Sequence, residues 1–215
     1  MIKCQKMEDY YKRYWKNEIE AGTMDKPPLH DNALLVQKKL NKFKKYLNGK
    51  CLDAGCGDGF VTSELNKITP TIGLDFSDVA IKKAKKNYPQ IRFIKGSVTN
   101  LPFNKNQFDC IFASELIEHI QDSEAMFYEF NRVLRKNGNL IITTPELTKL
   151  KNIFIALFYW DKYYHPVNPH IRFYSKKSIT EILKRFGFKI IHYEPDGRFF
   201  WFVPKGMIIV AKKIK

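Results

Sequence analysis

The ten-residue run CLDAGCGDGF, at positions 51–60, constrains the fold more than any other part of the sequence. It begins with an apolar stretch, residues 51–54, that is typical of a buried strand, and three glycines follow at alternate positions. A helical pattern starts at about Phe60. Glycine allows left-handed backbone and lets the chain approach a ligand closely. The run therefore predicts a strand, a tight turn suited to ligand binding, and a helix.

Short apolar runs alternate with helical patterns along most of the chain, which predicts an α/β fold with a largely parallel sheet. The seven expected strands are Cys51–Ala54, Thr71–Asp75, Ile91–Lys95, Phe108–Ala113, Asn139–Thr144, Lys189–Glu194 and Met207–Ala211. We expect Gly138 and Gly187 to end the helices that precede them. Because no helix separates the last two strands, they are expected to pair antiparallel, joined through residues 195–197 and Pro204.

Two helical patterns precede the first strand: Met7–Glu20, which is rich in Tyr and Trp, and a second in which Val36, Leu40, Phe43 and Leu47 share one face. With 215 residues, 44% of them apolar, the chain is expected to form a single domain with one sizeable core. The expected parts are a helical cap over 1–48, a core over 49–145, an inserted lid over 146–174, and a last helix with the C-terminal strands over 175–215.

The formal net charge of +15 is confined to the two flanks of the chain. Residues 51–150 carry twelve basic and twelve acidic side chains, residues 1–50 carry twelve against six, and residues 151–215 carry thirteen against four. Fifteen of the thirty-one aromatic residues also lie in the last segment. Thirty of the thirty-seven basic residues are Lys, which lacks the planar group that binds phosphate specifically, so we interpret the charge mainly as solvated lysine faces. This charge is also compatible with a weak contact to anionic membranes. No motif indicates specific nucleic-acid binding.

No stretch of the sequence predicts a membrane span or a secretory signal. The longest unbroken apolar run, Ile153–Trp160, has eight residues, whereas a spanning helix needs ~20. The N-terminal segment reaches charges and tyrosines before any apolar stretch. We therefore expect a cytoplasmic protein whose four cysteines stay reduced.

An acidic residue closes the strand after the glycine turn. Asp75 lies eighteen residues beyond Gly57, at the end of the second expected strand, where a carboxylate can accept hydrogen bonds from both hydroxyls of a ribose. The dinucleotide-binding fingerprint needs Gly or Ala at position 60, which Phe60 occupies instead. The sequence therefore disfavours a nicotinamide or flavin cofactor.

The glycine run resembles the first motif of the class I S-adenosylmethionine-dependent methyltransferases, with Asp53 as the acid inside it. GLDFSDVAIKKAKKN is similar to the second strand and following helix of that family, SVTNLPFNKNQFDCIFASELIEHI to its adenine loop and fourth strand, and VLRKNGNLIITTP to its fifth strand. The resemblance is dense over residues 48–145 and looser over 170–187 and 206–212. It implies a Rossmann-like three-layer sandwich that uses S-adenosylmethionine as methyl donor.

The resemblance also implies a set of cofactor-binding residues: Asp53, Gly55, Cys56, Gly57, Gly59, Asp75, Phe76, Ser97, Val98 and Ser114. Asp75 would hold the ribose hydroxyls, Phe76 would cover one face of adenine, and the backbone of Ser114 would lie beside the methionine. Many relatives have Gly-Asp after the third strand, where this chain has glycine and Ser97. The uncharged Ser97 and the backbone amide of Val98 are thus the expected adenine contacts, with a modest affinity.

The segment from Glu115 to His119 follows the fourth expected strand, at the edge where α/β sheets bind ligands. It resembles the Glu-x-x-Glu-His segment of ubiquinone-pathway O-methyltransferases and of small-RNA 2′-O-methyltransferases, where a later histidine completes a divalent-metal site. His170 stands at a comparable place here. Three roles stay open: Glu118 and His119 as a catalytic base or substrate contact, a structural role, and, least favoured, a metal site. That metal set would be Glu115, Glu118, His119 and His170, suited to magnesium, manganese or zinc.

The favoured function is methyl transfer to a small-molecule acceptor, anionic or partly apolar, at oxygen rather than nitrogen or carbon. Positioning the acceptor at the methyl carbon supplies most of the catalysis, and a hydroxyl acceptor also needs a base or a metal. The alternatives are an RNA methyltransferase, and a non-catalytic S-adenosylmethionine-binding or peripheral membrane partner. The oligomeric state is not constrained.

The inserted segment Leu150–His165 is expected to form a partly helical lid over the methyl group. Its apolar side chains would either line an acceptor pocket or pack on the sheet; they are Ile153, Phe154, Leu157, Phe158 and Trp160. Arg172, Arg198 and Lys205 are the candidates for contact with an anionic acceptor.

Overall fold

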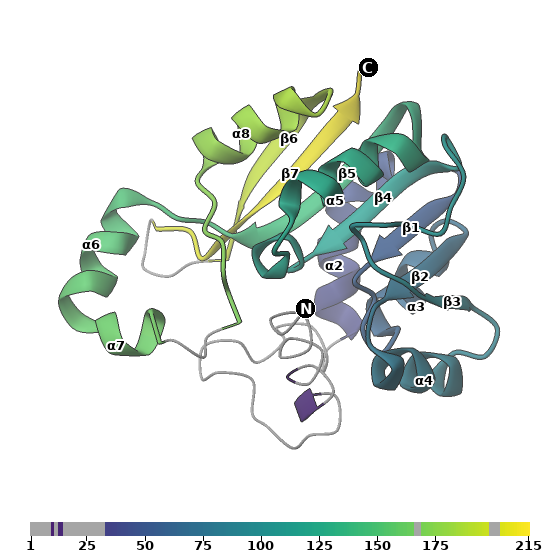
Figure 1. Ribbon diagram of the computed structural model, residues 1–215, viewed down its shortest axis with the longest axis horizontal. Coiled ribbons are helices and arrows are strands. Elements are labelled where there is room, and N and C mark those ends of the chain that lie inside the picture. The colour runs from purple at the N-terminus through teal and green to yellow at the C-terminus, as the bar shows by residue number, and fades with distance from the viewer. Residues whose placement is uncertain (1–9, 11–12, 15–32, 166–168, 198–202) are drawn as a thin grey trace.

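A twisted seven-stranded sheet forms the centre of the protein in the computed structural model, which describes residues 10, 13–14, 33–165, 169–197 and 203–215 (Figure 1). The strands follow the order β3-β2-β1-β4-β5-β7-β6. Their bounds are Cys51–Ala54 (β1), Thr71–Asp75 (β2), Arg92–Lys95 (β3), Phe108–Ser114 (β4), Leu134–Pro145 (β5), Phe188–Asp196 (β6) and Gly206–Lys213 (β7).

The first five strands run parallel, and β7 lies antiparallel between β5 and β6. The predicted α/β fold, with a mostly parallel sheet and an antiparallel ending, is therefore confirmed. Both faces of the inner strands are covered, so β1, β2 and most of β4 are buried along their length. This explains why these strands are continuous apolar runs in the sequence.

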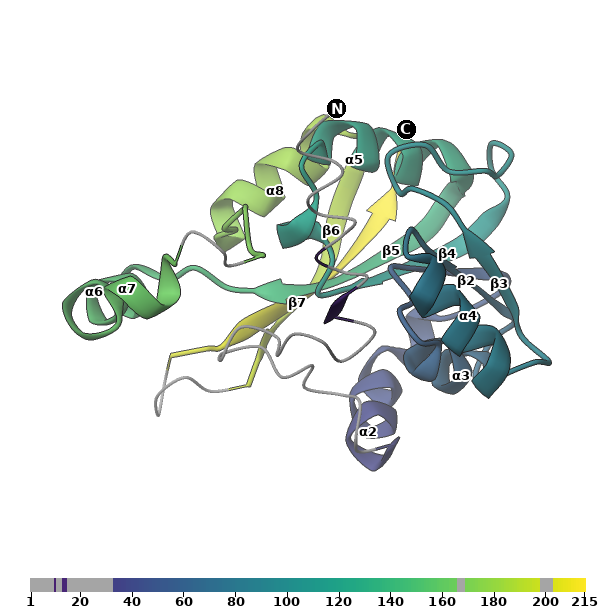
Figure 2. The ribbon, with the colours of Figure 1, turned by 60° about the horizontal axis from the view of Figure 1, so that its bottom comes forward.

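Helices cover the two faces of the sheet as two separate layers (Figure 2). On one face lie α2 (Ala33–Phe43), the short η1 (Lys44–Tyr46), α3 (Phe60–Asn66) and α4 (Asp78–Asn87). On the other face lie α5 (Ser123–Val133) and α8 (Lys176–Arg185), whose Phe127, Phe130 and Leu183 are fully buried against the strands. The predicted face of Val36, Leu40, Phe43 and Leu47 is buried, whereas the helix expected over Met7–Glu20 falls almost entirely outside the described residues.

Two predicted boundaries were wrong. The helix before β5 ends at Val133, not at Gly138, because β5 starts at Leu134 and pairs with Phe108 of β4 before a register shift. Arg135 in this added stretch forms an ion pair with Asp109 at 2.7 Å. The expected connection through residues 195–197 is also shorter than predicted, since β6 continues through Asp196. The prediction for Gly187 was correct: α8 ends at Arg185, and Gly187 has φ +79°.

The insertion after β5 forms two short helices, α6 (Lys149–Phe158) and α7 (Trp160–Tyr163), which project beyond the end of the sheet (Figures 1 and 2). A partly helical insertion was predicted, but the structure places most of its large apolar side chains at the surface rather than on the sheet. In the described part of the chain, no helix is long and apolar enough to span a membrane.

Candidate active site

The glycine turn after β1 uses backbone conformations that glycine adopts without strain. Gly55, Gly57 and Gly59 have φ values of +78°, +54° and +86°, in the left-handed region that side chains disfavour. The amide of Gly55 donates to the carbonyl oxygen of Leu74 at 2.8 Å, which holds the turn against the end of β2. A Cβ at Gly55 would lie 2.9 Å from Leu116 Cδ1. The turn therefore packs directly against the segment that follows β4.

Hydrogen bonds from two backbone amides hold the Asp75 carboxylate beside this turn. Its Oδ2 accepts from the Gly57 amide at 3.0 Å and its Oδ1 from the Ser77 amide at 2.8 Å. Ser77 in turn caps α4, accepting from the Ala80 amide. Burial raises the pKa of Asp75 above its ordinary value, and the amide hydrogen bonds oppose that shift. A carboxylate oxygen has two lone pairs, so each one retains the capacity to accept from a ligand hydroxyl.

Asp53 and Cys56 support the turn from beneath. The Thr62 hydroxyl donates to Asp53 Oδ2 at 2.7 Å, which ties α3 to β1. Burial, together with the charge of Asp75, raises the pKa of Asp53 to about 7. Cys56 is buried with its Sγ against Gly73, where an added Cβ would approach to 2.9 Å. The structure thus places both side chains under the turn rather than at its surface.

The residues expected at adenine follow the neighbouring strands β2 and β3. Phe76 comes directly after β2 and is half-buried. Ser97 is exposed, and its hydroxyl lies 2.7 Å from the Thr99 hydroxyl within its own loop. The Val98 side chain is buried in the main core, which anchors the loop backbone. Because β2 and β3 are parallel, these residues share the edge of the sheet that carries the glycine turn.

Two adjacent threonines at the end of β5 orient the two glutamates that follow β4. Thr143 Oγ1 donates to Glu115 Oε1 at 2.8 Å and also lies 2.8 Å from the Ser114 hydroxyl. Thr144 Oγ1 donates to Glu118 Oε2 at 2.9 Å. Glu115 has φ +47°, a strained conformation of the kind found at functional sites. The sequence prediction missed both threonines, although a polar pair at the end of a buried strand was a usable signal.

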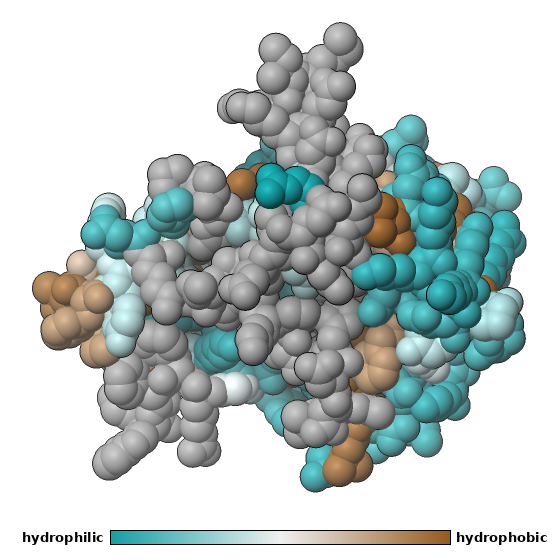
Figure 3. Space-filling view, turned by 90° about the horizontal axis from the view of Figure 1, so that it is seen from below, coloured by the Kyte–Doolittle hydropathy of each residue, from teal (hydrophilic) through white to brown (hydrophobic). Residues whose placement is uncertain are grey.

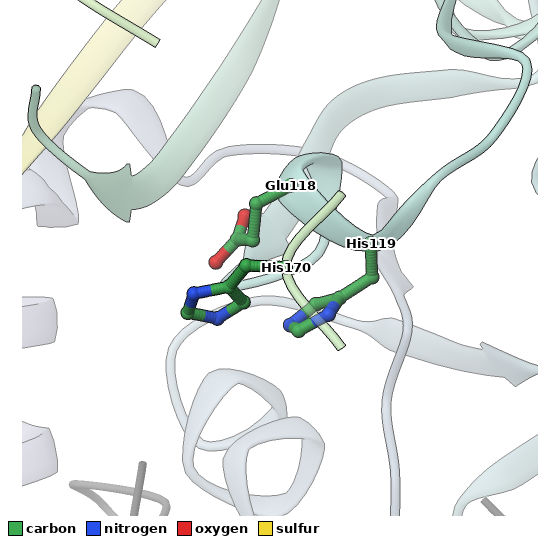
Figure 4. Close-up of side chains that lie close together, drawn as sticks. All are labelled: Glu118, His119 and His170. Atoms are coloured by element: carbon green, nitrogen blue, oxygen red, sulfur yellow. The ribbon is translucent and has the colours of Figure 1, made fainter. Parts of the chain in front are cut away.

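Glu118, His119 and His170 converge in one cluster beside these strands (Figure 4). Each side chain offers one atom that could bind a metal ion, a carboxylate oxygen or an imidazole nitrogen, and these atoms all lie within 4.8 Å of one another. Glu118 and His119 belong to the 3₁₀ turn Ile117–His119, whereas His170 comes from the segment before α8. His119 Nδ1 lies 3.1 Å from the Pro169 carbonyl oxygen. This contact favours the Nδ1–H tautomer, with the lone pair on Nε2.

The cluster contains three of the four side chains considered as metal ligands, and Glu115 is bound to Thr143 instead. A buried carboxylate and two imidazoles are a donor set that divalent ions accept. Burial, and the charge of Lys151 to a smaller degree, lower the pKa of His170 to about 4. The His170 imidazole is therefore neutral at neutral pH, as a ligand or hydrogen-bond acceptor must be.

A buried lysine holds the insertion to the sheet behind this cluster. Lys151 Nζ donates to the carbonyl oxygens of Glu146 at 3.1 Å and Lys205 at 2.9 Å. The ammonium group thus joins the first turn of α6 to the ends of β5 and β7. The sequence prediction did not single out Lys151, because a lysine in an apolar helix ordinarily points to solvent.

Arg172, one of the candidates for contact with an anionic acceptor, has its side chain bound within the protein. The Arg172 guanidinium donates to the carbonyl oxygens of Ile120, at 2.9 Å, and Gln121. The Arg172 amide also donates to the Glu118 carbonyl oxygen. Arg172 therefore fastens the His170 segment to the cluster, and Arg198 lies outside the described residues.

A family model described as a methyltransferase domain matches residues 29–193. The match covers well over half of the 215 residues, so the chain belongs to this family, the class I S-adenosylmethionine-dependent methyltransferases. The resemblance seen in the sequence is thereby confirmed. S-adenosylmethionine is the methyl donor that membership of this family implies.

Two curated relatives and one solved structure illustrate the similarity. Demethylmenaquinone methyltransferase of Chlorobaculum tepidum is 28% identical over 176 residues, covering 72% of this chain and 73% of the relative. Ubiquinone biosynthesis O-methyltransferase of Pelagibacter ubique is 30% identical over 131 residues, covering 59% and 54%. A structure titled as a SAM-dependent methyltransferase from Methanosarcina mazei has a TM-score of 0.65 at 20% identity, covering 80% of this chain and 97% of that chain, which shows the fold alone. The chain spans about half the length of other curated relatives, 51% and 57% in two of them.

Proposed function

We propose that this protein transfers a methyl group from S-adenosylmethionine to a hydroxyl oxygen of a small molecule. The observation that carries the proposal is the cluster of Glu118, His119 and His170 at the edge of the sheet where the glycine turn lies. The family supplies the donor, and the cluster supplies the acid–base groups that a hydroxyl acceptor needs. The relatives named for demethylmenaquinone and for ubiquinone biosynthesis agree with a small-molecule acceptor.

In this proposal the glycine turn and Asp75 hold the nucleoside of the methyl donor. Asp75 accepts from the ribose hydroxyls, and the turn lets the backbone approach the methionine part closely. Phe76, Ser97 and Val98 bound the adenine side, and Ser114 lies next to the methionine. Leu116 lies against Gly55, and the cluster residues Glu118 and His119 follow Leu116 in the sequence. The cluster therefore lies close to the glycine turn.

The reaction is an in-line displacement. The acceptor oxygen attacks the methyl carbon, the carbon–sulfur bond breaks, and S-adenosylhomocysteine leaves as a neutral thioether. The proton of the acceptor hydroxyl passes to His119 Nε2, while Glu118, fixed by Thr144, orients the acceptor. The same three side chains fit a divalent cation, which would supply a lower pKa for the bound hydroxyl.

The test is methyl transfer with isotopically labelled S-adenosylmethionine and a panel of phenols, catechols and alcohols, analysed by mass spectrometry. We expect an O-methylated product. The rate of the His119→Gln variant should be lower by a factor of at least about a hundred. Glu124→Gln, an exposed glutamate of α5, is the matched control and should keep the full rate. Loss of activity on chelation, restored by magnesium or manganese, would assign the cluster to a metal, and unchanged activity would assign it to a base. A product methylated at nitrogen or carbon, or an unaffected His119→Gln variant, would contradict the proposal.

A further inference from the structure

Helices α6 and α7 present a continuous apolar surface that the rest of the described chain does not cover. Five of its side chains are between 58% and 70% exposed: Leu150, Ile153, Leu157, Phe158 and Trp160. In the space-filling view this surface is the hydrophobic group at the projecting end of the molecule (Figure 3). Isolated exposed apolar residues are ordinary, whereas such a group on one projecting element marks an interaction site.

The outward orientation of this surface is fixed by the opposite side of α6. Ile155 is fully buried, and Lys151 is buried with its ammonium group bound to two carbonyl oxygens. Rotating α6 to bury Leu157 or Phe158 would break both of these anchors. The helix is therefore held with its apolar side toward solvent.

Aromatic residues with polar tips lie along the same surface. Trp160 and Tyr164 have ring centroids 4.7 Å apart, and Tyr164 also packs on Phe173 at 5.9 Å. Phe154 and Phe158 form a second pair at 4.9 Å. Trp and Tyr combine a large apolar ring with a hydrogen-bonding group, which suits the boundary between lipid and water.

Lysine side chains lie near the base of this surface. Residues 147–180 contain six basic side chains, one of them the buried Lys151, and one acidic side chain, Asp161. Lys149, Lys176 and Lys205 are exposed. Lys205 lies at the base of α6, because its carbonyl oxygen accepts from the Glu146 amide. Lys176 lies there as well: its ammonium group stands 4.0 Å from the ring centroid of Tyr193, and the Tyr193 hydroxyl donates to the Glu146 carboxylate.

We propose that α6 and α7 dock the protein on an anionic lipid bilayer, with their apolar side chains at the interface and the nearby lysines on the headgroups. The ten residues of α6 extend about 15 Å, so the helix lies in the plane of the interface rather than across the membrane. A second copy of this chain is disfavoured as the occupant, because its own net charge of +15 would bring like charges together. The proposed membrane-binding surface is distinct from the glycine turn and Asp75, and the proposal does not depend on methyl transfer.

Sedimentation with vesicles tests the proposal without cofactor or acceptor. The full chain is mixed with vesicles of phosphatidylcholine alone, or of phosphatidylcholine and phosphatidylglycerol in equal parts. The test variant is Leu157→Ser with Phe158→Ser, and the matched control is Leu34→Ser with Tyr128→Ser, which removes a comparably exposed pair from α2 and α5. Because both pairs are exposed, each variant should keep its fold, and thermal unfolding checks that it does.

We expect the protein to sediment with anionic vesicles, to lose binding at high salt, and to bind at least about tenfold more weakly in the test variant. The control variant should bind like the unmodified chain. Absence of sedimentation with anionic vesicles, or equal binding by the test variant, would overturn the proposal. So would self-association in solution that the test variant alone abolishes, because the surface would then join two copies of the chain.

Discussion

The substitution Asp53→Asn tests how the burial of this carboxyl group beneath the glycine turn affects stability. Burial raises the pKa of Asp53 from 3.8 to about 7, with a contribution from the charge of Asp75 and against the hydrogen bond from Thr62. Between these two values the side chain is protonated in the folded chain and ionised in the unfolded chain. The folded state then binds one more proton, so stability falls as pH rises, by about 1.4 kcal/mol per pH unit and about 4 kcal/mol over the window.

Asparagine keeps an oxygen for the Thr62 hydroxyl but cannot ionise, so the variant lacks this pH dependence. Urea unfolding at about pH 5 and about pH 7 measures the free energy of unfolding of both proteins. Between about pH 5 and about pH 7, the free energy of unfolding of the unmodified protein should fall by about 2 to 3 kcal/mol relative to that of Asp53→Asn. Titrating groups that do not interact with Asp53 are common to both proteins, and their contributions cancel. Parallel pH profiles would refute the reasoning, because they would mean that Asp53 is ionised in the folded chain.

Two further predictions concern the candidate site. Asp75→Asn replaces one acceptor oxygen with an amide that faces a backbone N–H, so affinity for S-adenosylmethionine should fall about a hundredfold by calorimetry; equal affinity in a folded variant would contradict the ribose assignment. Lys151→Met removes the nearby charge that lowers the pKa of His170, so this pKa should rise from about 4 but stay below 6.5, since burial remains. An unchanged His170 titration by NMR would contradict that cause.

Most of the sheet could be predicted because its strands are short apolar runs bounded by polar or glycine residues. Cys51–Ala54 and Thr71–Asp75 match the structure residue for residue. The start of β5 could not be predicted in this way. Residues 134–138 are mostly polar, and they join the sheet through pairing with β4 and the ion pair of Arg135 with Asp109. These are contacts between distant parts of the sequence, which a local pattern does not contain.

The candidate site was predictable in residue type more than in arrangement. Glu118 and His119 are adjacent, but their proximity to His170 depends on the Glu118 carbonyl oxygen, which accepts from two amides that follow that histidine. The roles of Thr144 and Lys151 likewise arise from tertiary contacts. The exposed side of α6 could not be predicted either. The run Ile153–Trp160 is apolar on every face, so its periodicity does not identify which face is buried.

A crystal structure of the protein with S-adenosylhomocysteine tests the central claim most directly. The account predicts the ribose hydroxyls within hydrogen-bonding distance of the Asp75 carboxylate, the glycine turn against the amino-acid part, and the sulfur facing Glu118, His119 and His170. A nucleoside bound elsewhere on the chain, or no binding at saturating ligand, would contradict it.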